Sequence, residues 1–88
     1  MTWKVEWDDR ASKELRKLDN QLQSDILDYL HDRIATDNDP RRFGKPFSYD
    51  KYGLWRYRVR DARIICCIED EQVTVLVTRA GHRKDVYE

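Results

Sequence analysis

Hydrophobic and polar residues alternate strictly from Trp55 to Arg60. Because successive side chains of a β-strand point to opposite faces of a sheet, this alternation predicts a strand with one buried face and one solvated face. Similar patterns predict three more strands, and the four expected strands cover residues 3–7, 54–60, 63–69 and 72–79. The links Asp61-Ala62 and Asp70-Glu71 are short enough to join the last three strands as hairpins.

Helical spacing replaces this alternation between the first two strands. Apolar residues at i, i+4 and i+7 over residues 11–18 predict a short amphipathic helix, which Asp8 and Asp9 can cap. A second apolar stripe over residues 22–34 predicts a second helix that runs to about Thr36. The two helices are expected to form an antiparallel hairpin. Their apolar stripes are expected to pack on one face of a sheet.

The boundaries of the second helix come from turn and cap residues. Asn20 with Gln23 resembles a capping box at its start, and the run at residues 37–40 ends it at a proline. Residues 41–53 are expected to be irregular. The order β-α-α-β-β-β predicts an α+β domain, with a helical hairpin packed on one face of a mainly antiparallel four-stranded sheet. Residues 1–88 are expected to form one domain, because 88 residues are too few for two cores.

The solvated face of the second strand carries a row of arginines. If the apolar residues of the sheet face the helices, four guanidinium groups point to the open face, from Arg56, Arg58, Arg60 and Arg63. A planar guanidinium suits phosphate oxygens, so the row indicates a surface for phosphates. An exposed row of this kind is also common on solvated faces and protected edges that bind nothing.

Charge is distributed unevenly along the chain. The 17 basic and 17 acidic residues cancel, which by itself argues against a nucleic-acid binder. The segment from Arg41 to Arg63, however, contains eight basic residues and two acidic ones, an excess of six positive charges. This local excess favours a polyanion as the partner. The basic residues of this segment that lie outside the arginine row are Arg41, Arg42, Lys45 and Lys51.

Several site classes have little support in the sequence. Cys66 and Cys67 are neighbours in an expected strand and point to opposite faces, so we expect no structural disulfide between them and treat Cys66 as core. No cluster of His, Asp and Glu has metal-ligand spacing, so we expect no metal and no cofactor. The chain has no signal peptide and no apolar run near 18 residues, which predicts a cytoplasmic protein without a membrane partner.

Four segments together resemble the RelE/ParE superfamily of bacterial toxins from type II toxin–antitoxin systems, and the resemblance covers nearly the whole chain. They are Leu54-Trp55-Arg56-Tyr57-Arg58-Val59, Arg63-Ile64-Ile65, Val73-Thr74-Val75-Leu76-Val77 and Gly81-His82-Arg83-Lys84-Asp85-Val86-Tyr87. The last segment is more similar to the RelE branch, whose toxins are ribosome-dependent endoribonucleases that cut mRNA in the A site. ParE-like toxins share the fold, lack the nuclease residues and poison DNA gyrase.

The resemblance implies a set of partners and leaves three functions open. The expected partners are a cognate RelB-like antitoxin, the 70S ribosome with its 30S A site, mRNA, and operator DNA in a higher-order toxin–antitoxin assembly. The leading interpretation is an mRNA endoribonuclease. The alternatives are a gyrase inhibitor without nuclease activity, and a catalytically inactive toxin that acts only in the toxin–antitoxin repressor complex.

The resemblance also implies a catalytic set for metal-free attack by the ribose 2′-OH on the adjacent phosphate. Its members in this chain are Arg56, Arg58, Arg63, Arg83 and Tyr87. The family commonly has lysines at the first two positions, and arginine stays protonated and cannot act as a general base. His82 is therefore one candidate for proton transfer. The alternative is that the arginines only position and stabilise the phosphate, and that water or a ribosomal group is the base. The residues expected to bind RNA or the ribosome are Arg60, Lys84, Arg41, Arg42, Lys45 and Lys51.

Overall fold

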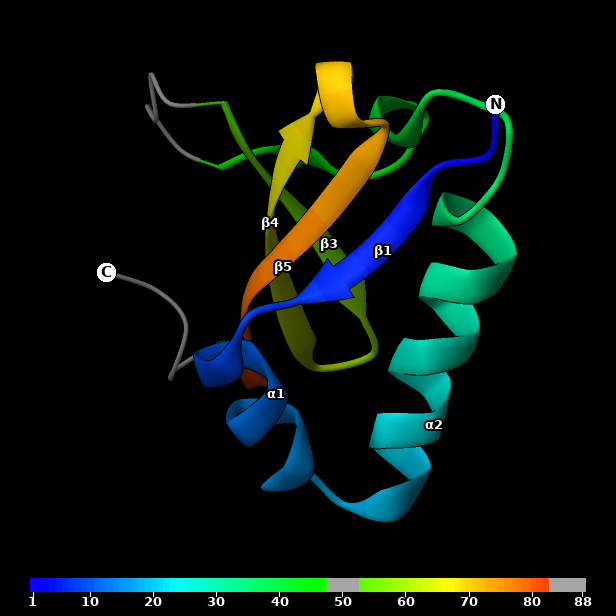
Figure 1. Cartoon of the computed structure of the whole chain (residues 1–88). Coiled ribbons are helices and arrows are strands. Elements are labelled where there is room, and N and C mark those ends of the chain that lie inside the picture. Colours follow the sequence, from blue (N-terminus) through cyan, green and yellow to red (C-terminus); the bar gives the residue numbers. More distant parts are fainter. Residues whose placement is uncertain (48–52, 83–88) are drawn as a thin grey trace.

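The computed structural model describes residues 1–47 and 53–82, which form a twisted sheet with two helices packed against it (Figure 1). The strands are β1 (Lys4–Trp7), β2 (Lys45–Pro46), β3 (Leu54–Val59), β4 (Ala62–Glu69) and β5 (Thr74–His82). Their order in the sheet is β1-β5-β4-β3-β2. β1 pairs with β5 in parallel, and the other neighbours are antiparallel. The α+β class with a mainly antiparallel sheet is confirmed.

The helices begin where acidic side chains cap them. At α1 (Asp9–Arg16), the Asp8 carboxylate accepts a hydrogen bond of 2.8 Å from the Ala11 amide, as predicted. At α2 (Asn20–Tyr29), the cap is Asp19, whose carboxylate accepts a bond of 2.7 Å from the Leu22 amide. α2 continues as one wide turn (Leu30–Ile34), closed by a bond from the Ala35 amide to the Leu30 carbonyl.

The predicted capping box was wrong by one residue. Asn20 is the first helical residue rather than the cap, and the Gln23 side chain donates to the Leu18 carbonyl. An ionised carboxylate one residue earlier is the stronger acceptor for the exposed amides of the first turn. The helix therefore begins at Asn20, directly after the Asp19 cap.

The prediction of four strands was also wrong, because residues 45–46 add a fifth strand at the edge of the sheet. Lys45 lies opposite Arg56, and Pro46 lies opposite Trp55. A two-residue strand is too short to show alternation, and an edge strand tolerates proline. Residues 41–53 were expected to be irregular, so this pairing was missed.

The core lies between the helices and one face of the sheet. As predicted, the sheet contributes Tyr57, Val59, Ile64, Cys66 and Ile68, with Trp55 partly buried against them. The helices contribute Ala11, Leu22 and Ile26 among others. Cys66 is buried and both cysteines are free thiols, so Cys66 fills the core. Burial raises the pKa of the Cys66 thiol, which keeps it protonated.

β5 is longer than the sequence pattern indicated. It was expected to end near residue 79, but Gly81 and His82 continue it opposite Arg63 and Ala62. Thr78 is left without a partner where the register shifts between Ile65 and Cys66, which makes a β-bulge. No helix in the described part of the chain is long and apolar enough to span a membrane.

Candidate functional site

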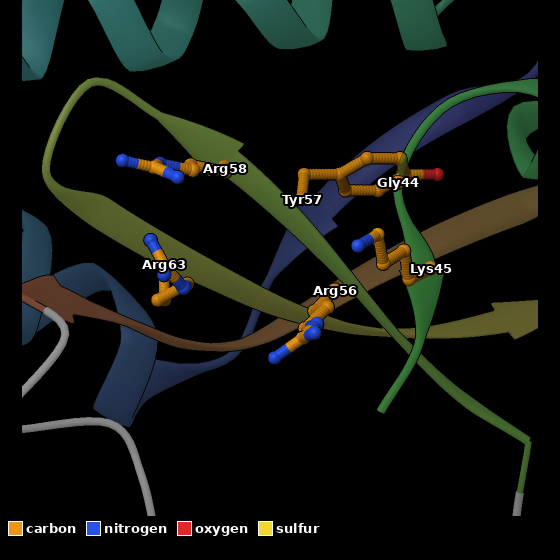
Figure 2. A pocket seen from close by; sticks show the side chains of 6 residues that line it. All are labelled: Gly44, Lys45, Arg56, Tyr57, Arg58 and Arg63. Carbon is orange, nitrogen blue, oxygen red and sulfur yellow. The ribbon is translucent and has the colours of Figure 1, made fainter. Parts of the chain in front are cut away.

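A hollow of about 230 Å³ opens on the sheet face opposite the core, and we call it the cationic hollow (Figure 2). Arg56 and Arg58 alternate with the buried Tyr57 on β3, so their side chains leave the sheet on the side away from the helices. β2 adds Lys45, and β4 adds Arg63. The residues that line the hollow are Gly44, Lys45, Arg56, Tyr57, Arg58 and Arg63.

Strand register places like charges directly opposite one another. Arg58 lies opposite Arg63, and Lys45 lies opposite Arg56. Side chains in such positions have Cβ atoms about 4.5–5.5 Å apart, and like charges there destabilise a sheet. An anion bound between the two pairs reduces this repulsion. The arrangement therefore favours an anionic ligand.

The cations differ in burial, which gives the hollow a floor and a rim. Arg63 is only 7% exposed, whereas Arg58 is exposed and its Nε donates a bond of 3.1 Å to the Arg60 carbonyl. A guanidinium does not lose its proton, so Arg63 keeps its charge in a partly desolvated setting. Electrostatic interactions are stronger there than in water.

Close contacts between residues 43–44 and β3 position Lys45. Gly44 has a φ of +75°, and a Cβ at this residue would overlap the Arg56 carbonyl oxygen on β3. The Trp55 indole Nε1 donates a bond of 2.7 Å to the Phe43 carbonyl. The segment therefore lies tightly against β3 only because residue 44 has no side chain. The sequence had indicated Lys45 as an RNA contact from its charge alone. The neighbouring Gly44 could have indicated that this segment packs closely against a strand, which places Lys45 beside Arg56.

The same segment is tied to β3 a second time. The Tyr57 hydroxyl donates a bond of 2.7 Å to the Pro40 carbonyl, and burial raises the pKa of this phenol. Tyr57 thus stays neutral and serves as a donor that holds residues 40–46 in place. Its ring belongs to the core, while its backbone lies between the two arginines of β3.

Arg60 does not continue the row, which corrects one predicted member of the open face. It lies in the turn after β3 with a φ of +55°, and its Nη1 donates a bond of 2.8 Å to Asp25 on α2. The turn ends the strand alternation, so the side chain reaches the helical layer instead. Hydrogen bonds from Gln21 and from Arg60 lower the pKa of the Asp25 carboxyl.

Arg41 and Arg42 lie outside the cationic hollow. The Arg41 guanidinium makes two bonds to the Asp70 carboxylate, of 3.0 and 2.7 Å, and these lower the pKa of Asp70. The Arg42 guanidinium lies 4.6 Å from the centre of the Phe43 ring. Both were predicted as RNA or ribosome contacts, and the structure brings neither of them to the four cations.

His82 ends β5 on the other side of the sheet from Arg63. It is exposed and lies opposite Ala62, a core residue, whereas its neighbour Gly81 lies opposite Arg63. Strand alternation therefore directs His82 to the helix-facing side. The predicted residues Arg83, Lys84, Tyr87 and Lys51 lie outside the described residues.

Comparisons with known proteins identify the family of the chain. Over residues 5–87 the chain matches the family model described as the ParE toxin of the type II toxin–antitoxin system parDE. The chain belongs to the RelE/ParE superfamily of toxins. The resemblance inferred from the sequence is thus confirmed.

The toxin is similar to several characterised members. It is 28% identical to Toxin RelG of Mycobacterium tuberculosis (strain ATCC 25618 / H37Rv), over 99% of this chain and 98% of the relative. It superposes on a chain of the toxin–antitoxin complex RelBE2 from Mycobacterium tuberculosis with a TM-score of 0.82, at 25% identity, covering 94% of this chain and 93% of that one. A chain of the intact E. coli RelBE complex shares the fold, with a TM-score of 0.71 at 21% identity over 91% and 95% of the chains.

The side chains around the cationic hollow are of the types that bind phosphate oxygens and stabilise negative charge. Its described lining offers N–H donors and no carboxylate, imidazole or thiolate. Within residues 1–47 and 53–82, no three His, Cys, Asp or Glu side chains gather into a metal-binding group. Guanidinium and ammonium groups, in their charged forms, are hydrogen-bond donors and have no acceptor. The described cations of the hollow are therefore suited to positioning a phosphate and stabilising charge on it.

Proposed function

We propose that this toxin is a ribosome-dependent endoribonuclease that cuts mRNA in the A site, with the scissile phosphate in the cationic hollow. The observation that carries the proposal is the convergence of Lys45, Arg56, Arg58 and Arg63 from three adjacent strands on one hollow. A hollow of about 230 Å³ is smaller than the roughly 300–1,000 Å³ of typical small-molecule pockets. It therefore suits a single group of a longer ligand.

The proposed reaction is an in-line transfer at phosphorus. The ribose 2′-oxygen forms a bond to phosphorus and loses its proton, while the bond from phosphorus to the 5′-oxygen breaks and that oxygen gains a proton. The products are a 2′,3′-cyclic phosphate and a 5′-OH. Negative charge builds up on the phosphate oxygens, where Arg58 at the rim and Arg63 in the floor donate hydrogen bonds. Loss of one such donor costs about 10²–10³ in rate.

The proton acceptor in this proposal is not an arginine. Arg56 and Arg58 occupy the positions where the family commonly has lysines, and they stay protonated. His82 belongs, by strand register, to the opposite side of the sheet. A charged ammonium group such as that of a lysine also has no acceptor, which leaves Lys45 as a donor. These observations support water or a ribosomal group as the acceptor. The family resemblance adds Arg83 and Tyr87 to the proposed catalytic set.

The same hollow suggests how the toxin is neutralised. The solved complexes RelBE2 and E. coli RelBE contain similar toxins with their antitoxins. We expect a cognate RelB-like antitoxin to cover the cationic hollow with an acidic and apolar segment that folds on binding. Its affinity should fall as salt rises, because exposed charges are screened. An assembly of both proteins on operator DNA is part of the same proposal.

Primer extension and end analysis test the proposal directly. The purified toxin is added to ribosomes programmed with an mRNA, and we expect new 5′ ends within the A-site codon. The upstream fragment should carry a 2′,3′-cyclic phosphate. Unbroken mRNA at all codons, with a folded toxin, contradicts the proposal.

A gyrase inhibitor is the second candidate, because the matching family model is described by its ParE members. Inhibition of DNA supercoiling by purified gyrase, together with intact mRNA on ribosomes, would favour it. In that case the cationic hollow would bind protein or DNA rather than mRNA. The two assays use the same purified chain and give opposite results for the two candidates.

A further inference from the structure

A second hollow, of about 250 Å³, lies on the sheet near the start of α1, and we call it the Phe47 hollow. It combines apolar side chains from β3 and β4 with polar and charged side chains from α1 and β5. Its lining residues are Asp8, Arg10, Phe47, Leu54, Ile65, Thr78 and Arg79. No residue that lines the cationic hollow lines this one.

The two hollows lie next to each other on one sheet face. Leu54 is two residues from Arg56 on β3, and Ile65 is two residues from Arg63 on β4, so each pair shares a face. Two residues along a strand span roughly 6.6 Å. A chain-like ligand whose phosphate lies in the cationic hollow therefore reaches the Phe47 hollow with its neighbouring group.

The lining has the character of a site for a flat, partly apolar group. Ile65 is 2% exposed and forms part of the floor, and Phe47 adds an aromatic ring. The guanidinium groups of Arg10 and Arg79 add planar cations. Aromatic rings and arginine planes are the groups on which proteins stack unpaired bases.

The acidic residues at this hollow are engaged within the protein. The Asp8 carboxylate caps α1 through the Ala11 amide. Glu14 binds Arg79, with Nε–oxygen distances of 3.2 and 3.0 Å, and it also accepts a bond of 2.9 Å from the Ala80 amide. These bonds hold Arg79 against α1 while its side chain lines the hollow. The hollow thus keeps a fixed arginine on one wall.

The bulge at Thr78 shapes the remaining wall. The Thr78 hydroxyl donates a bond of 3.1 Å to the Ile65 carbonyl, across the point where the register of β4 and β5 shifts. Bulges redirect side chains and commonly lie beside functional sites. Here the extra residue brings a hydroxyl group to the edge of the Ile65 floor.

We propose that the Phe47 hollow binds the base of the nucleotide next to the phosphate held in the cationic hollow. This inference rests on the proposed function, and it adds a base-binding site beside the phosphate site. The volume suits one base and not a drug-sized ligand. Stacking is tolerant of base identity, so the site contributes affinity and register more than codon choice.

Oligonucleotides with and without bases test the inference on the full-length chain. The probes are a 2′-O-methyl oligoadenylate tetramer, which has no attacking 2′-OH, and an abasic tetramer of the same charge. Binding is followed by calorimetry and by the Ile65 methyl signals in NMR spectra. We expect the adenylate tetramer to bind more tightly than the abasic one and to shift the Ile65 methyl signals.

Phe47→Leu is the decisive variant, because it keeps an apolar side chain and removes the ring. We expect it to weaken the adenylate tetramer by roughly 5- to 150-fold, the range of base–aromatic stacking, and to leave the abasic tetramer unchanged. Leu27→Ala is the matched control, since Leu27 is 46% exposed on α2 and lines neither of the two hollows. An unchanged thermal unfolding midpoint for Phe47→Leu confirms its fold.

The outcomes separate this inference from the proposed function. If both tetramers bind equally and Phe47→Leu changes neither, the base site is wrong while the phosphate site stands. If neither tetramer binds, or if Arg58→Ala affects neither, the phosphate site fails and the inference fails with it. If an acidic, apolar peptide shifts the Ile65 methyl signals and the adenylate tetramer does not, the hollow belongs to a protein partner and the inference is overturned.

Discussion

The two faces of the sheet are built by different physical rules. On the helix-facing side, Tyr57 and Ile64 lie opposite each other and are fully buried, so burial of apolar surface stabilises their pairing. On the other side, one residue along each strand, Arg58 lies opposite Arg63. That pairing of like charges costs stability. One face holds the fold together, and the other gathers positive charges at the proposed phosphate site.

Truncation of a core residue should break the helix-facing side most severely. Ile64→Ala removes a fully buried side chain and leaves a cavity, so we expect a loss of about 2–5 kcal/mol in the free energy of unfolding. Urea unfolding followed by circular dichroism measures it. Arg58→Ala, on the exposed face, should change the same quantity by less than about 0.5 kcal/mol. Equal losses for the two variants would contradict the division of roles between the faces.

Gly44→Ala should damage the cationic face through the backbone. The φ of +75° and the overlap with the Arg56 carbonyl oxygen force β2 away from β3, at a cost of about 1–3 kcal/mol. Because Lys45 then leaves its place opposite Arg56, phosphate binding should weaken as well. Calorimetry with the abasic tetramer measures the binding. Gly53→Ala is the matched control, since Gly53 has a similar φ of +78° but its Cβ would meet no atom within 4 Å, so it shows the effect of backbone strain without the overlap. Wild-type stability and binding in Gly44→Ala would show that the close approach is unnecessary.

The link between Arg60 and Asp25 should have a small, pH-dependent effect. The folded-state pKa of Asp25 is lowered, so its ionised form stabilises the protein above the ordinary value of 3.8, and this contribution is lost as the pH falls below that value. We expect Asp25→Asn to lower the thermal unfolding midpoint slightly at pH 7, and we expect the difference from the wild type to shrink as the pH falls below 3.8. A difference that persists at low pH would assign the effect to packing rather than charge.

His82→Ala should have the smallest effect on cleavage. If the four cations only position and stabilise the phosphate, the rate on programmed ribosomes should stay at the wild-type level from about pH 5.5 to 8.5, with an unchanged profile. A loss of several hundred-fold at every pH would instead make His82 a catalytic residue. Flattening of one limb near the histidine range would identify His82 as the proton carrier.

Sequence patterns predicted the elements whose periodicity is long enough to read. The strict alternation from Trp55 to Val59 correctly divided β3 into a core face and an arginine face, and the apolar stripes correctly marked both helices. The two-residue strand β2 was not predicted, because it depends on a tertiary contact between Gly44 and the backbone of Arg56. A contact of this kind leaves no periodic pattern in the sequence. The cap of α2 was predicted at Asn20 but lies at Asp19, because both residues are good caps and the sequence pattern does not distinguish neighbours.

Charge patterns predicted the candidate site less completely. Alternation placed Arg56, Arg58 and Arg63 on one face, and in the structure these three residues line one hollow. Arg60 and Arg41 carry the same charge but pair with Asp25 and Asp70, residues 35 and 29 positions away in the chain. Partners at such distances along the chain are set by the packing of helices and turns on the sheet. The Phe47 hollow was missed for the same reason, since its lining comes from five separate segments.

Single-turnover cleavage of mRNA on programmed ribosomes tests the central claim, that the cationic hollow holds and activates the scissile phosphate. Arg58→Ala is the cleanest variant, because its side chain is exposed and its loss leaves no cavity. Arg16→Ala, an exposed arginine in the last turn of α1, is the control for charge. We expect Arg58→Ala to cut about 10²–10³-fold more slowly than the wild type and Arg16→Ala to cut at the wild-type rate. Undiminished cleavage by a folded Arg58→Ala toxin would contradict the claim.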